Sequence, residues 1–198
     1  MDSHNIQSEL ASIRSLMERS TKFLSLSGLA GVLAGIYALI GGYLTYCFLG
    51  DGYQEISNAK IQKMVFIALV VLFLAVTTGF ILTKRQAKKN NETIWNPVSK
   101  KMIVNMLIPL ATGGLFILIL LMQGYFTLIA PSCLIFYGLS LIAAGEYSFS
   151  AVKWMGGLDI LLGILAAAFP LYGLFFWMAG FGGLHIVYGL RIYLNHNS

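Results

Sequence analysis

The sequence predicts an all-α, polytopic membrane protein with six transmembrane helices. Hydrophobic residues make up 58% of the 198 residues and charged residues only 11%, whereas a soluble domain carries about 25% charged residues. The apolar residues form long runs, and the charges lie between them. Within a bilayer the backbone polar groups must be bonded inside the protein, which helices achieve segment by segment. The net charge of +5 is divided among short segments, so nucleic acid is not an expected partner.

Run lengths give the number of crossings. A bilayer core about 30 Å thick needs roughly 20 apolar residues. The uncharged run from Met102 to Gly145 has 44 residues, too many for one crossing, so we predict a break at Gln123 and Gly124. The last run should break near Pro170. The predicted spans are 23–50, 64–83, 102–122, 124–145, 148–169 and 171–194.

Lys and Arg residues predict the orientation. With these spans, two of them, Lys60 and Lys63, fall on one side of the membrane. The other side carries eleven, six of them in a basic loop over residues 84–101. Because cytoplasmic segments are enriched in Lys and Arg, we expect both termini to be cytoplasmic in a bacterial inner membrane. The eleven are Arg14, Arg19, Lys22, Lys84, Arg85, Lys88, Lys89, Lys100, Lys101, Lys153 and Arg191.

Residues 1–22 precede the first span and predict a cytoplasmic amphipathic helix. Ile6, Leu10, Ile13 and Met17 recur at spacings of four, three and four, which places them on one helical face. Such a helix can lie on the membrane surface, pack under the bundle or dock a cytoplasmic protein partner.

The first span carries a face of small residues. Gly28, Gly31 and Gly35 follow one another at spacings of three and four, and small residues let helix backbones approach closely in lipid. This face is expected to serve packing inside the bundle or the seam of a homo-oligomer.

Short motifs recur in the second half of the chain. "GGLFILIL" at 113–120 is similar to "GGLDILLG" at 156–163, and "YGLSL" at 137–141 is similar to "YGLRI" at 188–192. Helices 3–4 and 5–6 are therefore predicted to be duplicated hairpins. The stretch from "GLDILLG" through "AFPLYG" to "YGLRIY" resembles the repeat of the HdeD family of six-helix bacterial inner-membrane proteins. That resemblance implies a link to acid resistance and supplies no catalytic residue.

Asp159 and His185 are the candidate site. Asp159 is the only Asp, Glu, Lys or Arg between Trp154 and Leu190. Counted from Pro170, Asp159 lies about 16 Å and His185 about 22 Å into the membrane. Because side chains tilt toward the start of their helix, the two are predicted to touch directly or through one water. The pair can be a proton-sensitive or ion-coupled centre, or a structural interhelical hydrogen bond.

Two functions remain open at the level of sequence. No catalytic motif, metal-ligand spacing or cofactor-binding motif is present, so we expect no enzyme, no metal site and no cofactor. The first hypothesis is a sensor or accessory protein that couples the membrane bundle to a cytoplasmic partner. The alternative is a small proton- or solute-coupled transporter or channel-like protein that uses Asp159 and His185.

Overall fold

The computed structural model describes residues 27–49, 58–91 and 93–197, and over these residues it contains helices and no strands. Six of its helical segments are long and apolar enough to cross a membrane, which confirms the predicted fold class at that level. The predicted amphipathic helix over residues 1–22 lies outside the described residues. The elements are α2 (Gly28–Leu49), α3 (Asn58–Lys89), α4 (Pro97–Gln123), η2 (Phe126–Leu128), α5 (Ile129–Gly145), α6 (Ser150–Ala168), η3 (Pro170–Tyr172), α7 (Gly173–Trp177), η4 (Met178–Leu184) and α8 (His185–Asn197).

Two helices are longer than their apolar runs. α3 extends to Lys89 and α4 begins at Pro97, where spans of 64–83 and 102–122 were predicted. Backbone hydrogen bonding continues through polar residues, so an apolar run marks the part of a helix in lipid rather than its ends. The predicted basic loop over residues 84–101 is therefore wrong in its bounds, because helix covers both of its ends. Its six cations lie on the last turns of α3 and the first turns of α4: Lys84, Arg85, Lys88, Lys89, Lys100 and Lys101.

The start of α4 is defined by a capping box. The Asn96 side chain accepts a hydrogen bond from the Ser99 backbone N–H at 2.7 Å, and the Ser99 hydroxyl accepts one from the Asn96 N–H at 3.0 Å. Pro97 occupies the first turn, where its missing N–H costs nothing. These local interactions begin the helix well before its apolar run.

The predicted breaks are confirmed. α4 ends at Gln123, and Gly124 follows with a φ of 79°, a left-handed conformation that glycine adopts without a Cβ clash. α6 ends at Ala168, and Pro170 opens a short 3-10 turn. Pro cannot donate the next helical hydrogen bond, so the chain reverses there.

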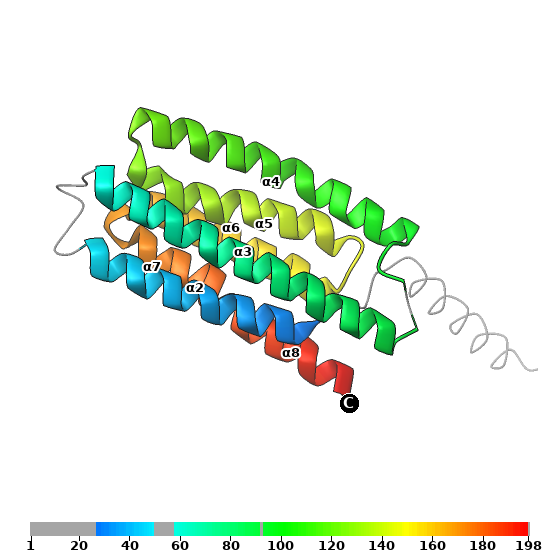
Figure 1. Ribbon diagram of the computed structural model, residues 1–198. Helices are drawn as coiled ribbons and strands as arrows, with labels where there is room; N and C mark the ends of the chain where they lie inside the picture. Colours follow the sequence, from blue (N-terminus) through cyan, green and yellow to red (C-terminus); the bar gives the residue numbers. More distant parts are fainter. Residues whose placement is uncertain (1–26, 50–57, 92, 198) are drawn as a thin grey trace, which may run out of the picture.

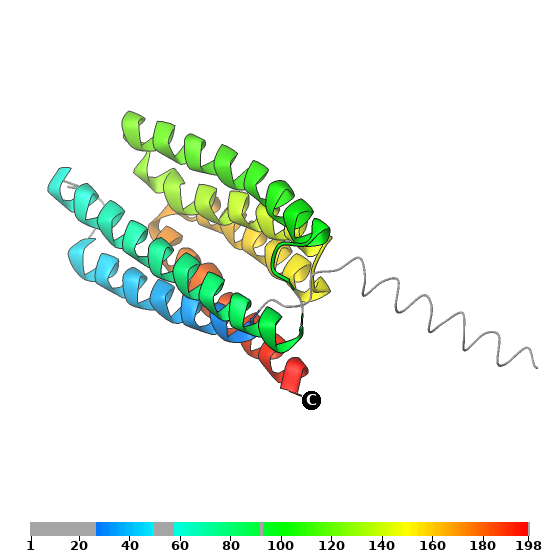
Figure 2. The same ribbon diagram turned by 45° about the vertical axis from the view of Figure 1, so that its right-hand side comes forward.

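The helices form two groups joined by the last span. α5 packs against α4 and α6, and α2 packs against α3 and α8. α7 and η4 connect the groups by contacting α5, α6 and α2, as Figures 1 and 2 show. The α3–α4 connection, the α5–α6 turn and the end of α8 lie at the same end of the bundle (Figure 1).

Glycines make the closest helix crossings. A Cβ added at Gly28 would lie 2.4 Å from the Gly189 carbonyl oxygen, and one at Gly35 would lie 2.7 Å from that of Gly182. The α5–α6 crossing is similar, because a Cβ at Gly138 would lie 2.5 Å from the Gly156 carbonyl oxygen. Backbone therefore packs on backbone at both crossings, as small residues allow in lipid.

The last span differs from the predicted continuous helix over 171–194. It begins as η3, continues as α7 and passes through a π-helix, η4, before α8. The π-helical sequence "MAGFGGL" contains three glycines, which weaken the preference for regular α-helix. Short π-helical turns are frequent at functional sites, and this one directly precedes His185.

Candidate functional site

Asp159 is the most unusual residue of the described chain. It is the tenth of the nineteen residues of α6, and its exposed fraction is 0%. Neither carboxylate oxygen has a hydrogen-bond partner. Native proteins leave few buried polar groups unsatisfied, and an exception calls for an explanation such as a catalytic role, a strain reservoir or a bound ion or water. Packing alone does not account for an acid at this position.

His185 is bonded to other residues than Asp159. Its Nε2 lies 2.7 Å from the Tyr137 hydroxyl, and its Nδ1 lies 3.1 Å from the Gly180 carbonyl oxygen. Both ring nitrogens are therefore occupied. The predicted direct contact between Asp159 and His185 is corrected, because sequence gives the height of a residue in its helix but not the direction its side chain faces. A contact through one water stays a prediction.

The hydrogen-bond partners define the tautomer of His185. A backbone carbonyl can only accept, so Nδ1 carries a hydrogen and donates it to Gly180. In a neutral imidazole the other nitrogen is then an acceptor, and the Tyr137 hydroxyl donates to Nε2. Neutral His185 is thus held between one donor and one acceptor.

Gly180 brings the two halves of the site together. A Cβ added there would lie 2.6 Å from Oδ1 of Asp159 and 2.4 Å from Cδ2 of Leu134. Its carbonyl oxygen accepts from His185. Asp159 and His185 therefore both lie next to one backbone position in η4, and only glycine leaves room there for the carboxyl group.

Aromatic rings hold His185 from one side. The Phe181 ring stacks on the imidazole with centroids 5.9 Å apart, and the Tyr137 ring lies 5.4 Å from it. Trp177 continues this group, 4.9 Å from Phe181. Trp177, Phe181 and His185 are spaced by four residues, so the turns of α7 and η4 align them on one face.

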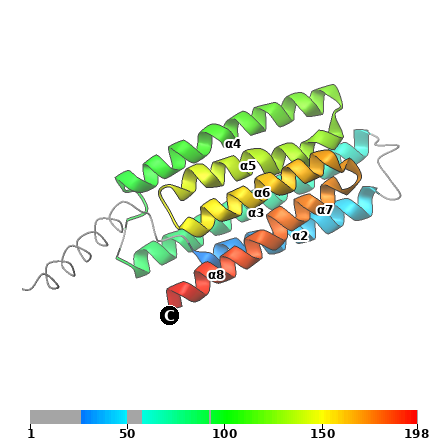
Figure 3. The same ribbon diagram turned by 180° about the vertical axis from the view of Figure 1, so that it is seen from behind.

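Within the described helices around Asp159, no compensating cation is found. From Met102 to Gly145 and from Trp154 to Leu190, Asp159 is the only Asp, Glu, Lys or Arg. The helices beside it are α5, α6 and the α7–α8 segment, which lie next to one another in Figure 3. An ionised Asp159 would have no opposite charge nearby, a situation that costs several kcal/mol in a buried environment.

The other predicted residues lie elsewhere. Gly28, Gly31 and Gly35 place α2 against α8 and η4, and a Cβ at Gly31 would lie 3.4 Å from the His185 carbonyl oxygen. This face therefore supports the element that carries His185. Lys153, at the start of α6, forms an ion pair with Glu146 at 2.5 Å. The six basic residues of α3 and α4 lie at that end of the bundle (Figure 1).

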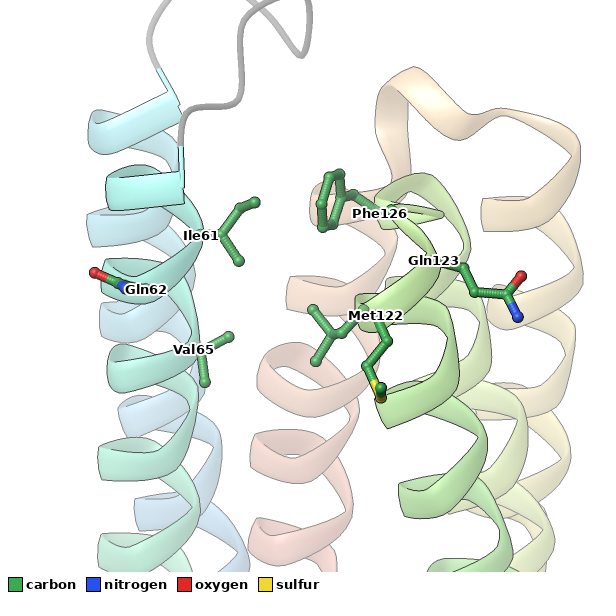
Figure 4. A pocket seen from close by; sticks show the side chains of 8 residues that line it. Ile61, Gln62, Val65, Met122, Gln123 and Phe126 are labelled. Carbon is green, nitrogen blue, oxygen red and sulfur yellow. The ribbon is translucent and has the colours of Figure 1, made fainter.

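A separate apolar groove opens between α3 and α4. It has a volume of about 530 Å³ and lies near the α4–α5 turn. Figure 4 shows Ile61, Val65 and Phe126 pointing into it, while Gln62 and Gln123 point away. None of its lining residues is titratable, and none belongs to the Asp159 site. The complete lining is Ile61, Gln62, Val65, Leu121, Met122, Gln123, Gly124 and Phe126.

No metal-binding cluster of three or more His, Cys, Asp or Glu residues is found in the described ranges. The carboxyl group of Asp159 is available for a proton, and the hydroxyl of Tyr137 and the imidazole of His185 are the neighbouring groups that can exchange one. The arrangement is therefore suited to proton binding.

Sequence reasoning missed Tyr137 and Gly180. The depth count applied to α5 would have found Tyr137, which lies thirteen residues after Gly124 and hence about 20 Å from that turn, close to the depth of His185. No comparable signal distinguishes Gly180 from the other glycines of "GFGG", because its role depends on which side chain from α6 faces it.

Comparison with known protein families, with curated proteins and with solved structures finds no match for this chain. Function is therefore inferred from the residues around Asp159.

Proposed function

We propose that the protein is a proton-responsive sensor in the bacterial inner membrane, with both termini in the cytoplasm, that couples a change in its bundle to a cytoplasmic partner. The observation that carries this proposal is the complete burial of Asp159 with both carboxylate oxygens unpartnered. A charge at the centre of a transmembrane helix costs about 2.5 to 3.5 kcal/mol on insertion scales. We infer that Asp159 holds a proton in the structure described.

Loss of that proton changes what the site requires. A carboxylate needs donors or water, and neither oxygen of Asp159 has a hydrogen-bond partner among the residues that the structure describes. Ionisation therefore favours a rearrangement that brings Asp159 to the Tyr137 hydroxyl or to water. Such a rearrangement moves α6 relative to α5 and η4, the elements packed around it.

The connection to the cytoplasmic end supports a sensor. α5 and α6 meet at a short turn, where Glu146 and Lys153 are paired beside the basic ends of α3 and α4. A shift of α6 would alter this surface. Its positive charge suits an acidic surface of a partner protein, in line with the cytoplasmic partner expected from the sequence.

Binding of the partner at two pH values tests this function. Full-length protein in nanodiscs is used to capture cytosolic proteins at neutral and mildly acidic pH, with Asp159→Asn and a deletion of residues 2–18 in parallel. We expect a specific partner whose capture changes with pH in the wild type and not in Asp159→Asn. Capture that is independent of pH, or equally pH-dependent in Asp159→Asn, would contradict a sensor based on Asp159.

Proton-coupled transport is the second candidate, favoured by the central position of Asp159 in α6. An acid halfway across the membrane is accessible to either side after a modest change in packing. Proteoliposomes with an imposed pH gradient and an internal pH dye test it. Proton flux above that of empty liposomes that is lost in Asp159→Asn supports transport, and its absence favours the sensor.

A further inference from the structure

We infer that the Tyr137 hydroxyl is a proton relay between Asp159 and His185, an inference that rests on the proposed function of Asp159 as a proton-binding group. Asp159 has no accessible surface, and Tyr137 and His185 are only partly exposed. A proton bound to Asp159 must therefore arrive and leave through a neighbouring group. Tyr137 and His185 are already joined by a 2.7 Å hydrogen bond.

The direction of that hydrogen bond makes the relay possible. Because Nδ1 of His185 donates to Gly180, Nε2 is free of hydrogen and accepts from Tyr137. The Tyr137 oxygen retains lone pairs that can accept from a second donor. A protonated Asp159 carboxyl is such a donor. The hydroxyl can thus accept from one side while it donates to the other.

The transfer balances without another reactant. The Tyr137 oxygen takes the proton of the Asp159 carboxyl, whose O–H bond breaks. At the same time the Tyr137 O–H bond breaks, and Nε2 of His185 takes that proton. The products are an Asp159 carboxylate and a His185 imidazolium, and Tyr137 is a neutral phenol before and after.

One link of the relay is open in this structure. The Tyr137–His185 bond is formed, but neither oxygen of Asp159 reaches a partner. Oδ1 instead lies against the backbone of Gly180. Rotation of the Asp159 side chain away from η4, or a small shift of α6 against α5, would close this link. Opening and closing it would control when the buried acid exchanges its proton.

Few titratable groups of the described residues surround Asp159. α5 contributes Tyr137, with Cys133 one turn earlier on the same face, and α8 contributes His185. α6 and the α7–η4 segment contribute no Lys, Arg or Glu between Trp154 and Leu184. Of these groups, Tyr137 is already hydrogen-bonded to His185. Tyr137 is therefore the residue that can connect Asp159 to His185.

The test is the rate at which the Asp159 carboxyl exchanges its proton for deuterium. Full-length protein in liposomes is transferred to D2O, and the carbonyl stretch of the protonated carboxyl is followed by infrared spectroscopy. The band is assigned by its loss in Asp159→Asn. We expect Tyr137→Phe and His185→Gln each to slow the exchange by at least about tenfold, and the double variant to be no slower than the slower single variant, since both act on one path.

Tyr147→Phe is the matched control, because it removes a Tyr hydroxyl from the same region of the chain. The Tyr147 hydroxyl lies 3.4 Å from the Asn105 side chain and does not contact His185. Its exchange rate should equal that of the wild type. Exchange as fast in Tyr137→Phe as in the wild type, including exchange too fast to resolve in both, would overturn the relay. His185→Gln provides the same test if Tyr137→Phe does not fold.

Failure of the proposed function is recognised separately. If no carboxyl band disappears in Asp159→Asn at any pH, Asp159 does not hold a proton and both proposals fall. If the band is present and titrates but exchanges independently of Tyr137, only the relay falls. ¹⁵N-histidine spectra add a second readout. Wild-type His185 should carry hydrogen on Nδ1 alone, and the Nε2 resonance should shift in Tyr137→Phe, which removes the donor to Nε2 but keeps the Gly180 acceptor of Nδ1.

Discussion

Gly180 is the residue on which the site depends sterically. The two atoms that a Cβ would approach most closely, Oδ1 of Asp159 and Cδ2 of Leu134, belong to residues with an exposed fraction of 0%. An added Cβ must therefore push packed side chains aside. Gly180→Ala should therefore destabilise the protein by about 1–3 kcal/mol, as overpacking does, and displace Asp159.

Gly183→Ala is the control within the same π-helix, since a Cβ there meets nothing within 4 Å. It should leave stability unchanged or raise it by up to about 1 kcal/mol, because alanine favours helix over glycine. Thermal unfolding in detergent distinguishes the two variants. Equal stability of Gly180→Ala and Gly183→Ala would show that the Asp159 side chain is not confined by η4.

Asp159 itself should make stability depend on pH. A carboxyl that is neutral when buried and ionised when the chain is unfolded takes up a proton on folding, so the free energy of unfolding should fall as pH rises. Asp159→Asn cannot ionise and should flatten this dependence while remaining about as stable as the wild type in acid. Melting temperatures from pH 5 to pH 9 measure the effect, and parallel curves for the two proteins would contradict a buried, protonated Asp159.

At the scale of elements, glycine-mediated crossings hold the helices together. α2 meets α8 at Gly28 and Gly189, and α5 meets α6 at Gly138 and Gly156. The second helix of one hairpin thus packs against the first helix of another in both cases. The α5–α6 crossing fixes the distance of α6, which carries Asp159, from α5. The α2–α8 crossing does the same for α8, which carries His185.

Gly28→Ala tests the α2–α8 crossing. Its Cβ would lie 2.4 Å from both the Gly189 carbonyl oxygen and the Tyr193 amide nitrogen, and backbone atoms cannot turn away as a side chain can. The helices must separate, which should cost about 1–3 kcal/mol. Gly79→Ala is the control on α3, where nothing lies within 4 Å. A Gly28→Ala protein as stable as Gly79→Ala would contradict the crossing.

At the scale of the whole molecule, basic residues collect at one end. Among the described residues, this end carries the six cations of α3 and α4 together with Lys153 and Arg191, and the opposite end carries Lys60 and Lys63. Because segments rich in Lys and Arg remain in the cytoplasm, we expect the α3–α4 connection to be cytoplasmic.

Single-cysteine labelling measures this orientation. In a protein with Cys47 and Cys133 replaced, Asn90→Cys should resist an impermeant thiol reagent in intact spheroplasts and react after lysis. Gln123→Cys, at the other end of α4, should react in both. Labelling of residue 90 before lysis would reverse the topology.

The sequence by itself determined the all-helical class, the six apolar helices of membrane-spanning length among the described residues, and two of the turns. Uninterrupted apolar runs report helix number directly, because lipid permits no unsatisfied backbone and excludes charge. Gly124 and Pro170 marked the turns through local backbone chemistry alone. The helix ends beyond the apolar runs, at Lys89 and Pro97, were missed because helical hydrogen bonding does not stop where polarity begins.

Only the tertiary structure decided how the site is composed. Composition and position within the apolar runs predicted Asp159 and His185 as a polar pair, and both lie next to Gly180. Their hydrogen-bond partners depend on the rotation of each helix about its axis. A helix that is apolar on every face gives no sequence signal for that rotation. The close crossings at Gly138 and Gly189 determine which faces of α5 and α8 turn inward. Tyr137 and Gly180 therefore bond to the imidazole of His185, and the carboxyl group of Asp159 is left without a partner.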